Sequence, residues 1–210
     1  SEPLWFLAEK KVLAKVGIDL DEKMVLQTRG LREDEVVEYW YDKYKWTNMS
    51  REEVSREILV CVTGLIREKC DLLPGARSAI KLAHSMHCQV ALASSSHMSV
   101  INTVLEKFGF TDFDCVYSAE YELRGKPDPA VYLTVCQKLK VEPKNCLAFE
   151  DSVNGVKAAK AAGIVCIAVP AQEEKNDKRF KIADGILNSL EEVNESLIKQ
   201  IMQNKQIKYL

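Results

Sequence analysis

The stretch CLAFEDSVNGVKAAKAAG, residues 146–163, decides how this chain folds. It begins with an apolar run and continues, after Glu150 and Asp151, with a helical pattern that ends at Gly163. Two carboxylates at the point where a buried strand gives way to a helix are a good site for a hard cation such as Mg²⁺. An acidic pair in this position could equally be a doublet that caps the helix, and the pair alone does not decide.

Strand-like runs and helical patterns alternate over the last two thirds of the chain. The apolar runs lie at 89–93, 115–118, 145–149 and 165–169, and the helical patterns lie at 76–84, 98–108, 130–139 and 152–162. Such alternation is typical of βαβ units and a parallel sheet. The runs are apolar throughout, which predicts strands covered on both faces. We therefore predict an α/β fold with a Rossmann-like parallel sheet as the core, over residues 73–210.

Residues 5–72 show only helical patterns. Apolar side chains recur at helical spacing from Trp5 to Val16, and Ser50 with Glu53 has the spacing of a capping box at the start of another helix. We predict a small helical cap subdomain over 5–72. A further helix with a charged, frayed end is predicted after Leu190.

The composition of the chain argues against several classes of function and leaves a protein that binds a small molecule. The formal net charge of −2 gives no electrostatic reason to expect binding to nucleic acid or to an anionic membrane. The longest apolar stretch, 164–171, is too short to cross a bilayer, and the N-terminal residues show no secretory signal. The seven cysteines form no C-x-x-C pair, so we interpret them as buried, reduced thiols. We expect a cytoplasmic monomer whose partner is a small metabolite.

Two more segments follow predicted strands and carry chemistry that suits a phosphate. Ser94–Ser96 stand between a strand and a helix, where hydroxyl groups and free backbone N–H groups can bind an anion, although serines there are usually helix caps. Lys126 lies in GKPDP, residues 125–129, a loop stiffened by two prolines. A loop lysine is normally solvated, but the carboxyl ends of parallel strands meet at one edge of a sheet. We therefore expect both segments to converge with Glu150 and Asp151.

These motifs resemble those of the haloacid dehalogenase superfamily. LAS (92–94), GKPDP (125–129) and FEDSVNG (149–155) look like its motifs two, three and four, and the β-phosphoglucomutase-like branch is the most similar. Within that branch the chain resembles the bacterial hexitol-phosphate and 2-deoxyglucose-6-phosphate phosphatases. The segments SEPLW (1–5), GLR (30–32) and 169–180 carry this finer likeness.

The resemblance implies a Mg²⁺-dependent phosphatase of small phosphorylated sugars or sugar alcohols, with an aspartyl-phosphate intermediate. It implies that Ser94 and Ser95 hold phosphate oxygens and that Lys126 neutralises developing charge. Asp151 would be the direct metal ligand, and Glu150 would either bind the metal as well or support one of its ligands.

The cap is implied to close over the substrate. Arg32 matches a cap position that contacts substrate in relatives, and Glu2 and Trp5 would face the cleft near it. A lid arginine could also grip a second phosphate, so a phosphosugar mutase stays an alternative.

The first motif of the superfamily, a strand that ends in Asp-x-Asp-Gly, is expected just before Ser1 and is absent from the sequence. The aspartates of the helical unit, Asp19, Asp21, Asp34 and Asp42, stand in the wrong context to replace it. We therefore expect the core to lack its first central strand and this chain, unlike its full-length parent, to have little or no activity. We favour an incomplete sequence over an evolved variant, with a non-catalytic binding module as a further alternative.

Overall fold

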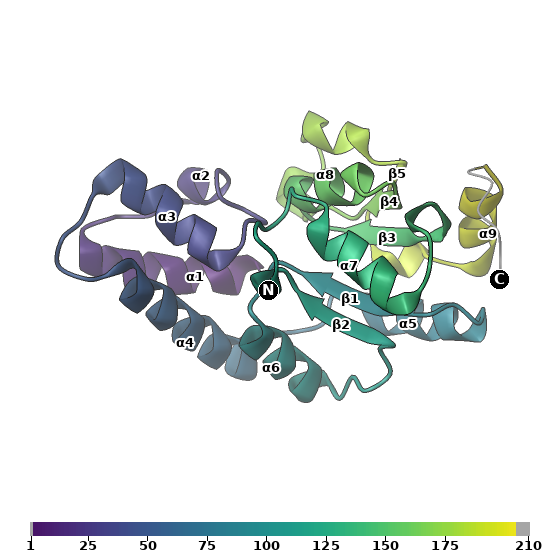
Figure 1. Ribbon diagram of the computed structural model, residues 1–210, viewed down its shortest axis with the longest axis horizontal. Coiled ribbons are helices and arrows are strands. Elements are labelled where there is room, and N and C mark those ends of the chain that lie inside the picture. Colours follow the sequence, from purple (N-terminus) through teal and green to yellow (C-terminus); the bar gives the residue numbers. More distant parts are fainter. Residues whose placement is uncertain (1, 205–210) are drawn as a thin grey trace. The chain divides into compact units, whose positions relative to one another are not determined.

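The computed structural model describes residues 2–204, and Figure 1 shows its helices and strands. Contacts divide the chain into two compact units. The first unit contains the described residues up to Asp71 together with Ser94–Thr111 and Ser118–Gly125. The second contains Leu72–Ala93, Asp112–Tyr117 and the described residues from Lys126 onward. These units are defined by contacts alone, so the division into a cap over 5–72 and a core over 73–210 stays a prediction.

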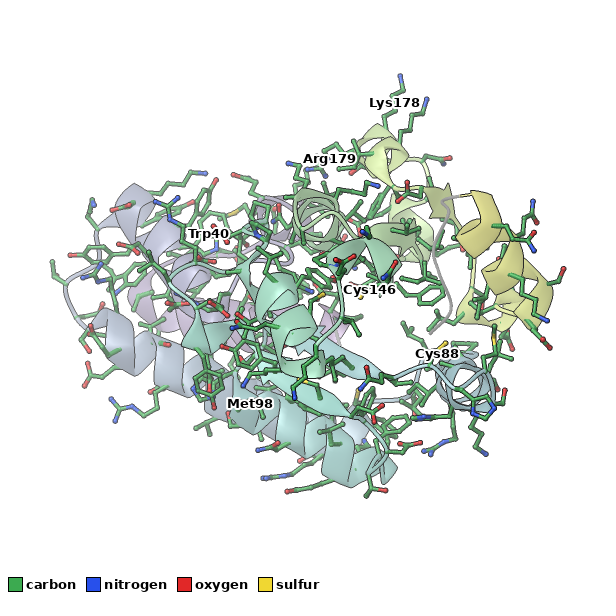
Figure 2. All side chains as sticks on the ribbon, turned by 45° about the vertical axis from the view of Figure 1, so that its right-hand side comes forward. Trp40, Cys88, Met98, Cys146, Lys178 and Arg179 are labelled. Carbon is green, nitrogen blue, oxygen red and sulfur yellow. The ribbon has the colours of Figure 1, made fainter. Side chains whose placement is uncertain are left out.

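The first unit is helical. Its helices are α1 (Glu2–Leu13), η1 (Ala14–Val16), α2 (Glu22–Val25), α3 (Glu33–Tyr44), α4 (Arg51–Lys69), α6 (Met98–Phe108) and η2 (Ala119–Tyr121). Helix α4 packs against α1, α3 and α6 around an apolar core that includes the fully buried Trp40, which Figure 2 labels. The predicted capping box is confirmed, because Ser50 Oγ accepts from Glu53 N and the Glu53 carboxylate accepts from Ser50 N.

The second unit holds most of the sheet residues. Its elements are α5 (Ala76–Ser85), β1 (Ala91–Ser94), β2 (Cys115–Ser118), α7 (Ala130–Leu139), η3 (Pro143–Asn145), β3 (Leu147–Glu150), α8 (Val153–Ala161), β4 (Val165–Ala168), η4 (Gln172–Glu174), η5 (Lys178–Ile182), β5 (Gly185–Ile186), η6 (Leu190–Glu192) and α9 (Glu195–Asn204). Strands β1 and β2 end in residues that belong to the first unit. Strand β3 pairs in parallel with β4, and β4 pairs in parallel with β5.

The predicted alternation of strands and helices is confirmed. Helices α6 and α7 and strand β2 have the predicted bounds, and the other predicted strands lie within about two residues of their runs. Strand β5 was not predicted, since two residues are too short to leave a periodic signal. The predicted last helix is α9; the part of the tail after Asn204 lies outside the described residues.

The sheet is in two parts, β1-β2 and β3-β4-β5. Strand β4 is buried along its whole length, whereas β1 and most of β3 are only half-buried. The prediction of strands covered throughout therefore fails for β1 and β3, and also for β2, of which only the last residue is buried. The reason is that, within residues 2–204, none of these three strands has a hydrogen-bonded neighbour on its second edge. A central strand that would pair with both β1 and β3 remains a prediction.

All seven cysteines are free, as predicted, although only Cys70, Cys136 and Cys166 are buried and the other four are half-buried. Among the described residues, no helix combines the length and the apolarity needed to cross a membrane.

Candidate functional site

Lys126 is a buried ammonium group at the ends of two strands. Its side chain is only 7 % exposed. Its Nζ donates to the Ala93 carbonyl near the end of β1 at 2.9 Å and to Glu150 Oε1 at the end of β3 at 2.5 Å. The interpretation of Lys126 as a solvated loop lysine is therefore wrong. The Lys126 ammonium thus connects the ends of β1 and β3.

Glu150 is held from several sides. Besides Lys126, the hydroxyl of Tyr132 on α7 donates to Glu150 Oε1. Burial and the nearby Glu150 charge raise the pKa of Tyr132 well above its usual range, so this hydroxyl keeps its proton and acts as a donor. Tyr132 was missed at the sequence level. Its only sequence signal is a hydroxyl group on the apolar face of a helix, and an aromatic side chain in that position is normally interpreted as a core residue.

The backbone of α8 lies close against the Glu150 carboxylate. A Cβ atom at Gly155 would lie 1.8 Å from Glu150 Oε2, so this position requires glycine. This contact explains the glycine of the predicted fourth motif, because the Glu150 carboxylate occupies the space that a side chain at position 155 would need.

Asp151 follows Glu150 and has a different environment. It is exposed, and among the described residues it has no hydrogen-bond partner. The cap of α8 is Ser152, whose Oγ accepts from Gly155 N at 3.0 Å. The alternative that Glu150 and Asp151 are a capping doublet is therefore wrong, because neither carboxylate caps α8.

Ser94 and Ser95 lie at the end of β1 and just beyond it, in the first unit. Ser94 Oγ accepts from Ser96 N at 3.1 Å, and Ser95 Oγ donates to the Gly30 carbonyl at 3.2 Å. The helix that follows, α6, is capped by His97, whose Nδ1 accepts from Ser99 N. The serines are thus not the caps of α6. Ser94 directly follows Ala93, the residue whose carbonyl binds Lys126, but convergence of all three segments stays a prediction.

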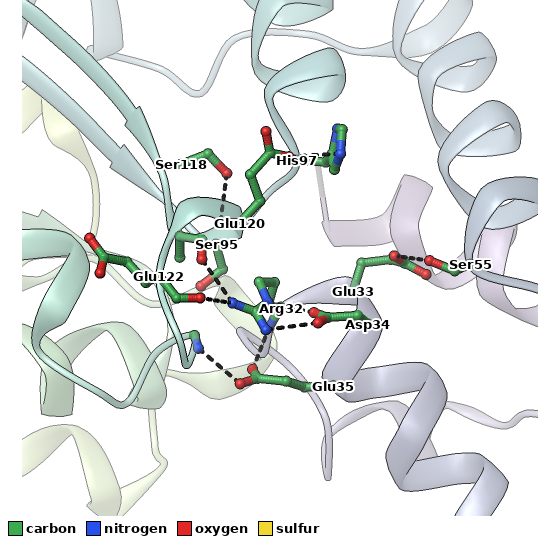
Figure 3. A network of polar contacts seen from close by, with 12 residues as sticks. Arg32, Glu33, Asp34, Glu35, Ser55, Ser95, His97, Ser118, Glu120 and Glu122 are labelled. Carbon is green, nitrogen blue, oxygen red and sulfur yellow. Dashed lines mark hydrogen bonds and ion pairs between the residues drawn. The ribbon is translucent and has the colours of Figure 1, made fainter. Parts of the chain in front are cut away.

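The three predicted cap residues have partners within the first unit. Arg32 donates from Nη1 to the carbonyls of Ala119 and Glu122, at 2.9 and 2.7 Å, and its other nitrogens pair with Asp34 (Figure 3). Glu2 lies 3.2 Å from Arg29 Nε. Trp5 is half-buried against the apolar core. Their contact with substrate stays a prediction.

Three of the four aspartates that the sequence excluded as nucleophiles have structural roles. Asp21 caps α2 by accepting from Met24 N, Asp34 pairs with Arg32, and Asp42 pairs with Lys45. Asp19 is exposed in the loop before α2.

The segment 169–180 that carried the finer resemblance divides between core and surface. Phe180 is fully buried, whereas Lys178 and Arg179 project outward from η5 (Figure 2). Arg179 pairs with Asp177 at the start of that helix.

A pair of buried acids in the first unit was not predicted. Glu9 and Glu33 are each less than one tenth exposed, and each has one carboxylate oxygen without a hydrogen-bond partner among the described residues. Burial, with the charges of Glu2 and Glu33 adding to it, raises the pKa of Glu9 to about 8. Burial likewise raises the pKa of Glu33 to about 7, against the hydrogen bond from Ser55. A glutamate within a helical pattern carries no local sequence signal that its side chain will be buried.

Comparison with known proteins gives concordant results. The sequence pattern of the haloacid dehalogenase-like hydrolases matches residues 7–163. Hexitol phosphatase B of Escherichia coli (strain K12) is 44 % identical over 195 residues, which cover 92 % of this chain and 88 % of that protein. The fold is similar to the crystal structure of β-phosphoglucomutase from Clostridium difficile, with a TM-score of 0.85, 26 % identity, and 98 % and 92 % of the two chains covered. CbbY from Rhodobacter sphaeroides in complex with phosphate gives a TM-score of 0.82 at 25 % identity over 91 % and 89 %.

Proposed function

Because the chain belongs to the haloacid dehalogenase-like hydrolases, we propose that it is a Mg²⁺-dependent phosphatase of small phosphorylated sugars or sugar alcohols. The likeness to hexitol phosphatase B over most of both chains supports this substrate class. The observation that carries the proposal is the buried ammonium of Lys126, held near the ends of β1 and β3 by the Ala93 carbonyl and by Glu150, the residue before the exposed Asp151. A cation fixed by two strand ends is suited to bind a phosphoryl group without moving.

Each remaining group has a role that its chemistry allows. Ser94 Oγ and the backbone N–H of Ser95 would hold phosphate oxygens, as a turn between a strand and a helix commonly does. Lys126 would neutralise the negative charge that shifts during transfer. Glu150 would keep that ammonium in place, since its carboxylate is already committed to Lys126 and Tyr132.

The residues present fit a magnesium ion. Among the described residues there is no cluster of three metal-binding side chains. Mg²⁺, however, usually keeps several waters and takes only one or two protein carboxylates together with a substrate phosphate. Asp151 is exposed and uncommitted, so we assign it as the direct ligand, with Glu150 behind it. When bound, the ion would offset the charge of the phosphate.

The nucleophile is not assigned to any of the 210 residues. The aspartyl-phosphate chemistry that the family implies needs an aspartate at the end of a strand, whereas Asp21, Asp34 and Asp42 of the helical unit have other roles and Asp19 lies in an exposed loop. The open edges of β1 and β3 would accept the strand that carries it. We therefore expect this chain to bind phosphate but not to turn over substrate.

Phosphate release from a panel of hexose and hexitol monophosphates tests the proposal. The 210-residue chain should be inactive, whereas a version with a strand ending in Asp-x-Asp-Gly joined before Ser1 should release phosphate only with Mg²⁺. In that version Asp151→Asn should lower turnover about 10²-fold or more and weaken the response to Mg²⁺, since hard cations prefer carboxylates. Asp19→Asn, a change at an exposed loop position, is the matched control. Rapid Mg²⁺-dependent turnover by the 210-residue chain would show that the nucleophile has been misplaced.

A phosphosugar mutase is the second candidate, favoured by the structural likeness to β-phosphoglucomutase. A mutase must grip a second phosphate, for which Arg32 is the candidate residue. Its guanidinium is already bound by Asp34 and two backbone carbonyls, which favours the phosphatase. Product analysis with a hexose monophosphate separates the two, because one yields free phosphate and the other an isomeric phosphosugar.

A further inference from the structure

Two cysteine thiols of the second unit lie in contact with one another. Cys136 is on α7, and Cys146, which Figure 2 labels, directly precedes β3. Their Sγ atoms are 3.8 Å apart, and both residues belong to the second unit. A disulfide has an S–S distance of about 2.05 Å, so the two sulfur atoms would have to come closer by less than about 2 Å. The pair is therefore close enough to form a disulfide.

The thiol contact lies beside the contact between Tyr132 and Glu150. Cys136 follows Tyr132 by one helical turn, so these two side chains lie on the same face of α7. Cys146 precedes Glu150 by four residues of extended backbone, so these two side chains lie on the same face of the strand. A bond between the two sulfur atoms would thus reinforce an existing contact between α7 and β3.

The two thiols differ in acidity and in exposure. The hydrogen bond from Cys146 lowers the pKa of the Cys136 thiol, and the same contact, together with burial, raises the pKa of the Cys146 thiol. Cys136 is therefore the first of the two to become a thiolate, which is the reactive form. Because Cys136 is only 4 % exposed and Cys146 is half-buried, the pair is open to a small oxidant. Burial raises the pKa of Cys166 on β4 to about 12, which keeps that cysteine an unreactive thiol.

We propose that Cys136 and Cys146 are an oxidation site, which reacts with a small peroxide and closes reversibly to a disulfide between α7 and the start of β3. The Cys136 thiolate attacks one oxygen of the peroxide, so that an S–O bond forms, the O–O bond breaks and hydroxide leaves. The hydroxide takes up the proton that Cys136 had released. The Cys146 sulfur then loses its proton and attacks the sulfenic acid on Cys136, so that the S–S bond forms, the S–O bond breaks and water leaves. Two thiols are oxidised, and one peroxide is reduced to two water molecules.

The second step is not blocked by the raised pKa of Cys146. The main cause of that shift is the hydrogen bond to Cys136, and the negative charge that strengthens this bond is gone once Cys136 is a sulfenic acid. The disulfide would add a covalent link beside the hydrogen bond from Tyr132 to Glu150. The proposal does not rest on the proposed function, because the S–S bond is measured without any phosphate chemistry.

Peroxide treatment of the reduced 210-residue chain tests the proposal. Free thiols are blocked with an alkylating reagent after the reaction, and the chain is then digested with trypsin. Cys136 and Cys146 fall in different tryptic peptides, because Lys138, Lys140 and Lys144 lie between them. Mass spectrometry measures the linked pair of peptides, whose mass is that of both peptides less two hydrogen atoms. A mixture of unlabelled and isotope-labelled chains separates a link within one chain from a link between two chains.

Cys61 and Cys70 are a matched control within the same chain. They are nine residues apart, against ten for Cys136 and Cys146, and they also fall in different tryptic peptides. Cys61 lies within α4 and Cys70 caps its end, so roughly 13 Å of helix separates them, which is too far for a disulfide. In concentrated urea the two loops are similar in length and should close about equally. The ratio of Cys136–Cys146 links to Cys61–Cys70 links should therefore be about tenfold or more higher in the folded chain.

Three further results are expected. Dithiothreitol should remove the Cys136–Cys146 link, because the bond is a disulfide. Cys146→Ser should leave a sulfenic acid on Cys136, which dimedone traps as an adduct. Cys88→Ser, a change at a half-buried cysteine of the same unit, should leave the amount of the link unchanged.

Several outcomes would overturn the proposal. The first is a ratio of links that is the same in the folded chain and in urea. Links between two chains, or links from Cys136 to other cysteines in a comparable amount, would also contradict it. Absence of a dimedone adduct in folded Cys146→Ser would show that Cys136 is not the attacking thiolate. If Cys146→Ser does not fold, the ratio in the wild-type chain still decides, because it needs no variant. Failure of the phosphatase proposal would appear only in phosphate release.

Discussion

At the scale of single residues, the centre of the candidate site is a buried ion pair. Lys126 and Glu150 side chains are each 7 % exposed, and Tyr132 adds a hydrogen bond to the same carboxylate. Desolvation of two charges offsets much of their attraction, so such a pair contributes little net stability compared with apolar side chains. Breaking it is costly, because the partner is left as an unpaired buried charge.

Lys126→Met should therefore lower the free energy of unfolding by about 3–5 kcal/mol, since Glu150 then lacks its counter-ion. Adding Glu150→Gln should recover much of this loss, because the amide oxygen still accepts from Tyr132 and carries no charge. Urea unfolding of the two single variants and the double variant measures the coupling. Lys157→Met, an exposed change on α8, should be near neutral. Wild-type stability in Lys126→Met would mean that the ammonium is not buried in solution.

At the scale of elements, the junction between β3 and α8 depends on a glycine, Gly155. Alanine in a helix is normally about 1 kcal/mol more favourable than glycine. At Gly155, however, a Cβ would lie 1.8 Å from Glu150 Oε2 and 2.2 Å from its Cδ. Gly155→Ala should therefore destabilise the chain, by about 1–3 kcal/mol, because Glu150 must leave its place.

Gly64→Ala is the matched control for this change. Gly64 lies within α4, and a Cβ there would meet no atom within 4 Å. This variant should gain up to about 1 kcal/mol from helix propensity. Thermal unfolding of both variants decides the matter: stabilisation by both would show that the close approach of α8 to Glu150 is not maintained in solution.

The elements themselves could largely be predicted from the sequence, because their signals are local. Hydrophobic period, capping residues such as Ser50 and the spacing of glycines located the helices and most strands within a few residues. The site was predictable only in part. Lys126, Glu150 and Asp151 follow strands, which the pattern reveals, but Tyr132 and the buried Glu9 gain their environments from residues far away along the chain. No local pattern encodes such contacts.

At the scale of the whole molecule, the two compact units differ in the features that could destabilise them. Among residues 2–204, strands β1 and β3 each have an edge without a hydrogen-bonded neighbour, and edges of this kind favour pairing with another strand. The first unit has an apolar core built from four of its helices, with Glu9 and Glu33 buried in the same unit. The overall stability of the chain should therefore respond to pH through the first unit.

The sign of that response follows from the raised pKa values. Glu9 has a pKa of about 8 in the folded chain against an ordinary value of 4.5, so the folded chain binds this proton more tightly than the unfolded chain. The stability that it contributes is complete below about pH 4.5 and is lost as the pH rises toward 8. Glu33, with a pKa of about 7, acts in the same direction.

Glu9→Gln should remove its share of this dependence, because an amide keeps the shape of the protonated acid and cannot ionise. At about pH 5 the variant and the wild type should be similarly stable, whereas at pH 8 the variant should be more stable, on the order of 2–4 kcal/mol. Urea unfolding across this range measures the difference, and the exposed Glu68→Gln on α4 should follow the wild-type curve. Parallel curves for Glu9→Gln and wild type would show that Glu9 is ionised in the folded chain throughout, and hence that water or a cation reaches the α1 carboxylate.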